Sequence, residues 1–290
     1  MLDSVVSVLP HWPGYARGGR PELPPGAAPE GTAVAIAPGG YLVTALHVVD
    51  RALEIEVRLP DGRQVLAELV GGDPASDLAV LRIETELPLL PDAPEPELGA
   101  PVCAVGNAFG LDLSVTCGVV SALHRSGVGF NEVEDFVQTD ASVNPGASGG
   151  ALVDREGRLV GILSAIFTKG SDADIGVNFA ASTALVRRVV PDLIERGRVV
   201  PAHPGLKLGE LSDAERRRHA GVLVLKVEPG GAAEAAGIEA GDLVTAIAGR
   251  PVRSVAAVRA AIALRRPGDR VEIALAADGE PRVVTLVLGR

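Results

Sequence analysis

The chain is poor in aromatic residues, which make up only 3% of its 290 residues, although 47% are hydrophobic. Its core must therefore consist mainly of Val, Leu, Ala and Ile side chains. No run approaches the ~20 consecutive apolar residues that a membrane-spanning helix requires. The formal net charge of −10 argues against nucleic acid or an anionic membrane surface as a main partner.

The amino-terminal residues, Met1 to Val6, contain neither a basic segment nor a long apolar core. Because a secretory signal peptide needs both, the sequence as printed predicts a cytoplasmic protein. The alternative is that a leader was removed before the first residue.

Only two cysteines are present, Cys103 and Cys117. The sequence predicts that they lie on two strands of a hairpin that turns near residues 109–112. A cross-strand disulfide is geometrically possible there and would fit an oxidising compartment. The interpretation that we favour is two buried free thiols that pack as small hydrophobic side chains.

Short runs of aliphatic and β-branched residues, separated by glycine-containing turns, extend over 31–83 and 101–180. This pattern is typical of antiparallel β-barrels. Hairpin turns are predicted at 60–63 and 155–158. Residues 9–30 are rich in proline and glycine and show no apolar period, so we expect a loop or a partly disordered insertion.

Residues 182–198 are predicted to form a helix with one apolar face, capped by Ser182 or Thr183. Pro191 lies inside this segment. Because proline lacks a backbone N–H and its ring contacts the preceding turn, we expect a kink or a restart there.

Ser148 lies in a glycine-rich bend, residues 146–150. Small residues on both sides of a serine let a substrate carbonyl approach the main chain closely. They also let backbone N–H groups converge on one point, as a tetrahedral oxyanion beside a nucleophile requires. Such a bend is often only a turn, so its significance depends on partner residues.

Two such partners, His47 and Asp77, lie upstream of the bend. His47 follows an apolar run that predicts a strand end, and Asp77 opens an apolar strand. A serine hydroxyl needs a base to take its proton, and imidazole titrates in a useful range. The imidazole in turn needs a carboxylate on its other nitrogen, which fixes the tautomer and stabilises the cation.

Each of these residues has an ordinary structural interpretation when it is taken alone. A single histidine near a strand is usually a packing or surface residue, and the chain has five. An aspartate at a strand start is usually a turn residue. The order His, Asp, Ser is nevertheless one in which catalytic triads occur. Together, His47, Asp77 and Ser148 predict nucleophilic catalysis.

With these residues the chain resembles the HtrA/Deg-type serine proteases. The likeness runs from about residue 3 to the C-terminus. The segments that are similar to signature stretches of the family are 42–49, 77–83, 105–111, 118–122 and 138–146. The resemblance implies a mainly β fold, with a chymotrypsin-like double antiparallel β-barrel over 1–200 and a smaller α+β PDZ domain over 205–290. It also implies that 9–30 is a regulatory loop.

The resemblance implies that the backbone N–H groups of Gly146 and Ser148 form the oxyanion hole. The family usually carries asparagine just before its serine, whereas this chain has Ala147. Alanine has no side-chain hydrogen bond with which to hold the oxyanion loop. We therefore expect lower or more strongly gated activity rather than none.

The resemblance also places the primary specificity pocket. Ser142 lies where the base of the pocket is found, and Ser164, Ala165 and Ile166 would form one wall, with Ser164 hydrogen-bonded to Asp77. Because Ser142 is neutral, a Lys or Arg side chain of a substrate would find no opposite charge. We expect cleavage after small or medium aliphatic residues.

The C-terminal part looks like a PDZ domain because of a strand at 221–227, a short helix at 232–237 and a strand with its turn at 241–249. In such domains a peptide C-terminus adds as an extra strand. The residues expected to capture its carboxylate are Leu208, Gly209, Glu210 and Leu211. Glu210 puts a negative charge where the family has an apolar residue, so the alternative is a domain used mainly for assembly or gating.

The predicted function is a serine endopeptidase that cleaves unfolded or misfolded proteins, with peptide binding or regulation through the PDZ domain. We expect neither a metal nor a cofactor. The alternatives are a weakly active or non-proteolytic chaperone or scaffold that retains the protease fold, and a processing protease with one native substrate. The resemblance also implies a homotrimer, C-terminal peptide ligands and an extracytoplasmic, periplasmic location.

Overall fold

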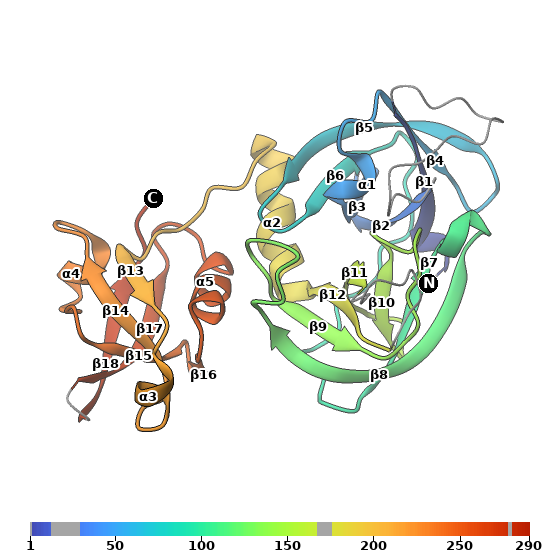
Figure 1. The fold of residues 1–290 in the computed structure, drawn as a ribbon. Helices are drawn as coiled ribbons and strands as arrows, with labels where there is room; N and C mark the ends of the chain where they lie inside the picture. The colour runs from blue at the N-terminus through green and yellow to red at the C-terminus, as the bar shows by residue number, and fades with distance from the viewer. Residues whose placement is uncertain (1, 13–29, 167–175, 278–279) are drawn as a thin grey trace. The chain divides into compact units, whose positions relative to one another are not determined.

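The structure is a computed structural model that describes residues 2–12, 30–166, 176–277 and 280–290. The chain divides into two compact units, the first made of Met1–Arg125 and Phe130–Val199, and the second of Ser126–Gly129 and Val200–Arg290. Figure 1 shows strand barrels and one long helix in the first unit, and a sheet with short helices in the second.

The first barrel closes through six strands in the order β1-β2-β3-β6-β5-β4. Its elements are η1 (Leu2–Ser4), β1 (Val5–His11), β2 (Gly31–Ala37), β3 (Tyr41–Ala45), α1 (Leu46–Val49), β4 (Glu54–Arg58), β5 (Gln64–Asp73) and β6 (Leu78–Arg82). Along β4, Ile55 and Val57 are buried while Glu54 is exposed. This alternation arises because successive side chains of a strand point to opposite faces, and it gives the barrel an aliphatic interior.

The second barrel closes in the order β10-β11-β12-β9-β8-β7. Its elements are β7 (Pro101–Gly106), η2 (Ala108–Gly110), β8 (Ser114–Arg125), β9 (Phe136–Thr139), β10 (Ala151–Asp154), β11 (Leu159–Ile166) and β12 (Asn178–Ser182). The predicted double antiparallel barrel is thereby confirmed. The two predicted hairpin turns are also correct, since they join β4 to β5 and β10 to β11.

One helix, α2 (Thr183–Arg196), follows the second barrel and packs against β5, β6, β11 and β12. The side chain of Ser182 caps it by accepting from the N–H of Leu185, and Gly197 ends it in the left-handed conformation. The predicted restart at Pro191 is wrong, because the helix continues through this residue. Packing against strands of both barrels offsets the one backbone hydrogen bond that proline cannot make.

Part of the predicted loop at 9–30 is a strand. Residues 9–11 belong to β1, and residues 13–29 lie outside the described part of the chain. From Leu9 onward β1 pairs with β4 and no longer with β2, whose last partner is Val8. A position that is paired on one side tolerates Pro10, which has no N–H to donate to a ladder.

The favoured interpretation of the two cysteines is also wrong, because Cys103 and Cys117 form a disulfide. The two residues lie directly opposite each other in the β7–β8 pair, with Cα atoms 4.0 Å apart. Cys117 is exposed rather than buried. The register of the hairpin, which the sequence does not state, decides this pairing.

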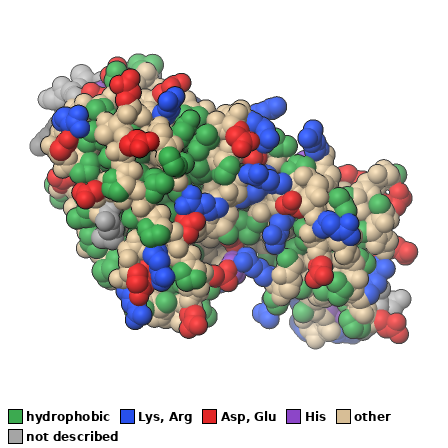
Figure 2. All heavy atoms as spheres, turned by 180° about the vertical axis from the view of Figure 1, so that it is seen from behind, with side chains coloured by type: hydrophobic (Ala, Val, Ile, Leu, Met, Phe, Trp, Pro, Cys, Tyr) green, Lys and Arg blue, Asp and Glu red, His purple; other side chains and the backbone are tan. Residues whose placement is uncertain are grey.

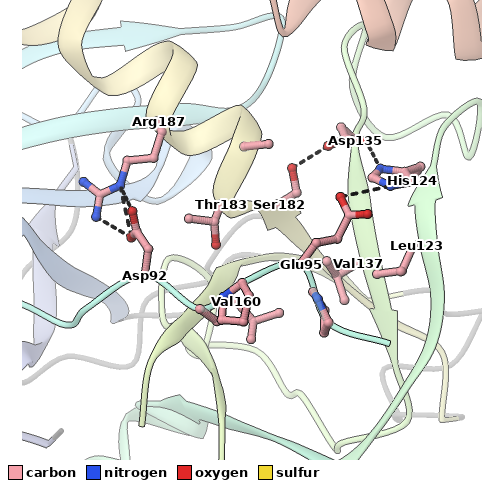
Figure 3. Close-up of a pocket in the computed structure, with 14 residues that line it drawn as sticks. Asp92, Glu95, Leu123, His124, Asp135, Val137, Val160, Ser182, Thr183 and Arg187 are labelled. Carbon is pink, nitrogen blue, oxygen red and sulfur yellow. Dashed lines mark hydrogen bonds and ion pairs between the residues drawn. The ribbon is translucent and has the colours of Figure 1, made fainter. Parts of the chain in front are cut away.

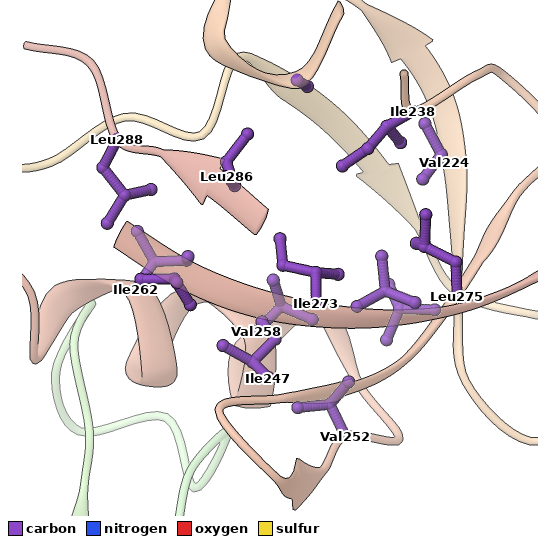
Figure 4. Packing of buried hydrophobic residues seen from close by; sticks show 14 of the residues in the cluster. Val224, Ile238, Ile247, Val252, Val258, Ile262, Ile273, Leu275, Leu286 and Leu288 are labelled. Atoms are coloured by element: carbon purple, nitrogen blue, oxygen red, sulfur yellow. The ribbon is translucent and has the colours of Figure 1, made fainter. Parts of the chain in front are cut away.

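The second unit is a sheet in the order β13-β14-β15-β17-β18, with β16 paired to β15. Its elements are β13 (Leu206–Gly209), α3 (Asp213–Arg216), β14 (Val222–Val227), α4 (Ala232–Ala235), β15 (Leu243–Ile247), β16 (Arg250–Pro251), α5 (Val255–Ala263), β17 (Arg270–Ala277) and β18 (Glu280–Val287). Figure 4 shows Val258 and Ile262 of α5 packed beside Ile273 of the sheet. Residues 278–279, which follow β17 in the chain, lie outside the described residues.

The surface mixes side chains of all kinds. Figure 2 shows acidic, basic and hydrophobic side chains intermingled over the face drawn. Within the ranges that the structure describes, no helix combines the length and the apolar character needed to cross a membrane.

Candidate active site

His47 and Asp77 meet where the β3–β6 strand pair ends. The register pairs Ala45 with Leu78, and His47 and Asp77 lie just beyond these two residues. Nδ1 of His47 is 2.6 Å from Oδ2 of Asp77, and the backbone N–H of His47 donates to Oδ1 at 2.9 Å. The backbone carbonyl of Asp77 accepts from the N–H of Leu46 at 2.8 Å. One aspartate therefore holds both the imidazole ring and the backbone of His47.

Asp77 is largely buried, whereas the imidazole of His47 is accessible to a reacting group. The Asp77 side chain is 16% exposed, whereas that of His47 is 52% exposed. Asp77 has a φ of 58°, a left-handed conformation that aspartate tolerates better than most residues. With Nδ1–H donating to the carboxylate, Nε2 of His47 keeps its lone pair, and no other described residue engages it. The ring is therefore oriented to accept a proton at Nε2.

Thr32 holds the bend that carries Ser148 against the first barrel. The Thr32 N–H donates to the carbonyl oxygen of Ser148 at 3.0 Å, and its hydroxyl donates to that of Gly146 at 2.8 Å. On the other side, the N–H of Gly149 donates to the carbonyl of Leu163 at 2.7 Å. Sequence reasoning missed Thr32, because a single threonine in a strand carries no signal of such a role.

The bend can approach both barrels only because it contains glycine. A Cβ atom at Gly149, whose φ is 83°, would lie 2.1 Å from the Thr32 carbonyl oxygen and 3.0 Å from the backbone nitrogen of Ala45. Ala45 lies two residues before His47. The structure thus brings the Ser148 bend against the strand end that carries His47. No hydrogen bond between the side chains of Ser148 and His47 is present in the described part of the chain.

Two peptide planes in the bend are fixed by hydrogen bonds at their carbonyl ends. The carbonyl of Pro145 accepts from a backbone N–H of η2 at 2.7 Å, and that of Ala147 accepts from the N–H of Gly150 at 2.9 Å. In a trans peptide the N–H points opposite to the carbonyl. The N–H groups of Gly146 and Ser148 are therefore directed away from these bonds, and neither donates to another described residue.

Ala147 fits this arrangement without a side-chain hydrogen bond. It is 5% exposed and packs in the core of the second barrel, while its N–H donates to the carbonyl of Asn144 at 3.0 Å. Backbone and Thr32 contacts hold the loop in place of the asparagine that the family usually carries.

Ser142, the predicted base of the pocket, lies in a segment that is hydrogen-bonded to β8. Ser142 is exposed, and its carbonyl accepts from the hydroxyl of Thr116 at 2.5 Å. The N–H of Val119 donates to the carboxylate of Asp140 at 2.7 Å. Strand β8 therefore fastens the segment that leads to Ser142 at two points.

Ser164 does not make its predicted contact. Its hydroxyl is buried and has no hydrogen-bond partner among the described residues, so the predicted bond to Asp77 is wrong. Both carboxylate oxygens of Asp77 are already engaged by His47. Ala165 and Ile166 continue the backbone of β11, and their side chains lie outside what the structure describes.

In the second unit, Leu208 and Gly209 are the last two residues of the edge strand β13, and Leu211 is buried. The Glu210 carboxylate accepts from the N–H of Val255, the first residue of α5, at 2.7 Å. It also pairs with Arg216 at 3.1 Å. Glu210 therefore has a structural role at the start of α5, which its charge suits because the N-terminus of a helix favours anions.

A cavity of about 240 Å³ lies elsewhere in the first unit, and none of the three candidate catalytic residues lines it. Figure 3 shows His124 between Glu95 and Asp135, with Asp135 turned toward Ser182. Asp135 is 2% exposed and accepts from the Ser182 hydroxyl at 2.5 Å, while His124 Nδ1 is 3.0 Å from its other oxygen. These contacts anchor the first turn of α2.

The comparisons with known proteins agree with this architecture. A family model described as a trypsin-like peptidase domain matches residues 31–162, and a PDZ domain model matches residues 194–277. A solved structure, the HtrA-type protease AlgW with tripeptide, is 34% identical, with a TM-score of 0.76 over 99% of this chain and 93% of that one. The chain belongs to the HtrA family of serine proteases.

Curated HtrA-family relatives include two periplasmic enzymes of Escherichia coli (strain K12). The pH-dependent serine endoprotease DegQ is 38% identical over 86% of this chain and 56% of its own length. The serine endoprotease DegP is 39% identical over 86% of this chain and 54% of its own length. The chain thus spans about half the length of the curated relatives that it matches.

Proposed function

We propose that this HtrA-family chain is a serine endopeptidase in which Ser148 is the nucleophile, His47 the general base and Asp77 the residue that orients His47. The observation that carries the proposal is the double hold of the Asp77 carboxylate on His47, at Nδ1 and at the backbone N–H. His47 takes the serine proton at Nε2 as the hydroxyl attacks a peptide carbonyl, and later gives it to the leaving amine. The acyl-enzyme is then hydrolysed by water.

The N–H groups of Gly146 and Ser148 stabilise the oxyanion that forms at the attacked carbonyl. Their peptide planes are fixed before a substrate arrives, so little reorganisation is needed during the reaction. Ser142, at the proposed base of the pocket, is neutral and offers no opposite charge to Lys or Arg, which supports small or medium aliphatic residues before the scissile bond. The peptidase domain spans residues 1–200, and the PDZ domain spans 205–290.

The substrates that we propose are unfolded or misfolded proteins, with C-terminal peptides bound at the PDZ domain. The Cys103–Cys117 disulfide and the periplasmic relatives support an extracytoplasmic location, since disulfides persist in oxidising compartments. By family resemblance the chain assembles as a homotrimer.

Labelling with a fluorophosphonate probe, together with casein degradation, tests the proposal. The wild-type chain should label at Ser148 and degrade unfolded casein, and Ser148→Ala should do neither while folding normally by circular dichroism. If the wild-type chain stays unlabelled even with a peptide activator, the endopeptidase proposal fails and a non-proteolytic role replaces it. Labelling with casein left intact would instead indicate a processing protease with one native substrate.

A further inference from the structure

A histidine and two glutamates come together on the outside of the first barrel, at the open end of the β1–β4 strand pair. Nε2 of His11 lies 3.0 Å from Oε2 of Glu56. The carboxylate of Glu54 joins them, and one possible ligand atom from each of the three residues lies within 4.8 Å of the others. Nothing in the proposed peptidase reaction uses this cluster.

The strand register explains why the three side chains share one face. His11 is paired directly with Glu54, and Glu56 follows Glu54 by two residues on the same strand. Side chains two apart on a strand point to the same side. The residues between them, Pro10 and Ile55, form the next pair, and Ile55 is buried in the barrel. The strand pairing therefore holds the three donors on one rigid surface.

The donors match the coordination chemistry of zinc. Zinc takes imidazole nitrogen and carboxylate oxygen at about 2.0–2.2 Å, which puts tetrahedral ligand atoms about 3.3 Å apart. His11 and Glu56, at 3.0 Å, are already close to this spacing, and Glu54 has to close by at most about 1.5 Å to reach it. Glu54 is exposed and can rotate to do so. The hard cations Mg²⁺ and Ca²⁺ prefer oxygen-only sets, so the imidazole favours a transition metal.

Burial and charge also suit a metal. The side chains of His11 and Glu56 are 25% and 20% exposed, so water competes only partly for the ion. With neutral His11, the three residues carry two negative charges. Arg58, two residues beyond Glu56 on β4, pairs with Glu30 at 2.6 Å.

We propose that His11, Glu54 and Glu56 form a binding site for one divalent transition metal ion, with Zn²⁺ the best match and water as a fourth ligand. The bound ion joins β1 to β4 at the end of this strand pair. Because an unfolded chain does not preform such a site, binding stabilises the folded first unit. From the sequence we expect no metal and place His11 in a loop, whereas in the structure His11 lies in a strand opposite Glu54.

Zinc titration of the full chain, followed by calorimetry, tests this site. All proteins carry Ser148→Ala to prevent self-digestion, so the result is independent of the proposed peptidase activity. The test variants are His11→Gln and Glu54→Gln. The matched controls are Glu68→Gln, which removes the same charge from exposed β5, and His219→Gln, which removes an exposed histidine from the second unit.

The reference chain should bind one Zn²⁺ at a site whose affinity falls at least ~10-fold in each test variant, because each removes a direct ligand. The two controls should bind as the reference does. Zinc should also raise the thermal midpoint of the reference and of the controls, but not of the test variants. Equal affinities in all five proteins, or a loss confined to a control, would overturn the proposal. Glu54 is exposed, so Glu54→Gln keeps the test valid if His11→Gln folds poorly.

Discussion

The hydroxyl of Thr32 donates a hydrogen bond to the carbonyl oxygen of Gly146, 2.8 Å away, and so ties the serine bend of the second barrel to β2 of the first. The same hydroxyl accepts from the N–H of Asn107 at 2.9 Å. Thr32 is fully buried. One side chain therefore couples the two barrels at the point where the proposed oxyanion hole is built.

Thr32→Val should reduce turnover of a peptide substrate by about tenfold or more, because the Gly146 peptide loses its fixed orientation. It should also destabilise the fold by about 2–5 kcal/mol, since a buried N–H and a carbonyl lose their partner. Thr32→Ser keeps the hydroxyl and serves as the control. Steady-state kinetics and urea denaturation measure both effects, and a Val variant with the turnover of the Ser variant would contradict the coupling.

Replacing both Cys103 and Cys117 by serine should lower the free energy of unfolding by about 2–4 kcal/mol. Thr116, next to Cys117, holds the carbonyl of Ser142, so we also expect a higher KM for peptides. Wild-type protein in reductant should match the double variant in both measurements. If reductant leaves the unfolding midpoint and the KM of the wild type unchanged, the disulfide does not support this hairpin.

Ser142→Asp should shift cleavage toward sites after Lys or Arg, because a carboxylate at the proposed base of the pocket supplies the missing opposite charge. A peptide library digested by the wild type, by Ser142→Asp and by Ser142→Ala measures the preference. Ser142→Ala should keep the aliphatic preference. Cleavage after Arg by the wild-type chain would contradict the pocket assignment.

Glu210→Gln should destabilise the second unit by about 1 kcal/mol, because the start of α5 loses a charged acceptor at Val255 and an ion pair with Arg216. Glu280→Gln removes an exposed charge from the same unit and is the control. Urea denaturation followed by circular dichroism compares the two. Equal midpoints would show that the Glu210 contact contributes nothing measurable.

Burial alone would raise the pKa of Asp154, but hydrogen bonds from the backbone and side chain of Arg158 hold it below its ordinary value. The stability that this carboxylate contributes is therefore present above its unfolded pKa and is lost as pH falls through its lower folded pKa. Asp154→Asn should destabilise the chain at neutral pH and make less difference in acid. Urea midpoints from neutral to acidic pH measure this, and a difference from wild type that does not depend on pH would contradict it.

Much of the site could be predicted because its signals are local. The bend at Ser148 needs its flanking glycines for local backbone reasons, and the short continuous apolar runs beside His47 and Asp77 are typical of buried strands. The N-terminal cap of α2 could also be predicted, since Ser182 acts within one turn of the helix start.

The contacts that could not be predicted depend on which residues face each other across strands or between barrels. The pairing of Cys103 with Cys117, the bond from Thr32 to Gly146, and the meeting of His11 with Glu54 join residues that are distant in the chain. A shift of one residue in register would turn each strand's side chains to the other face. The amino-acid sequence by itself determined the barrels and the residues suited to catalysis, whereas only the tertiary structure decided the partners, because register is set by the packing of the whole barrel.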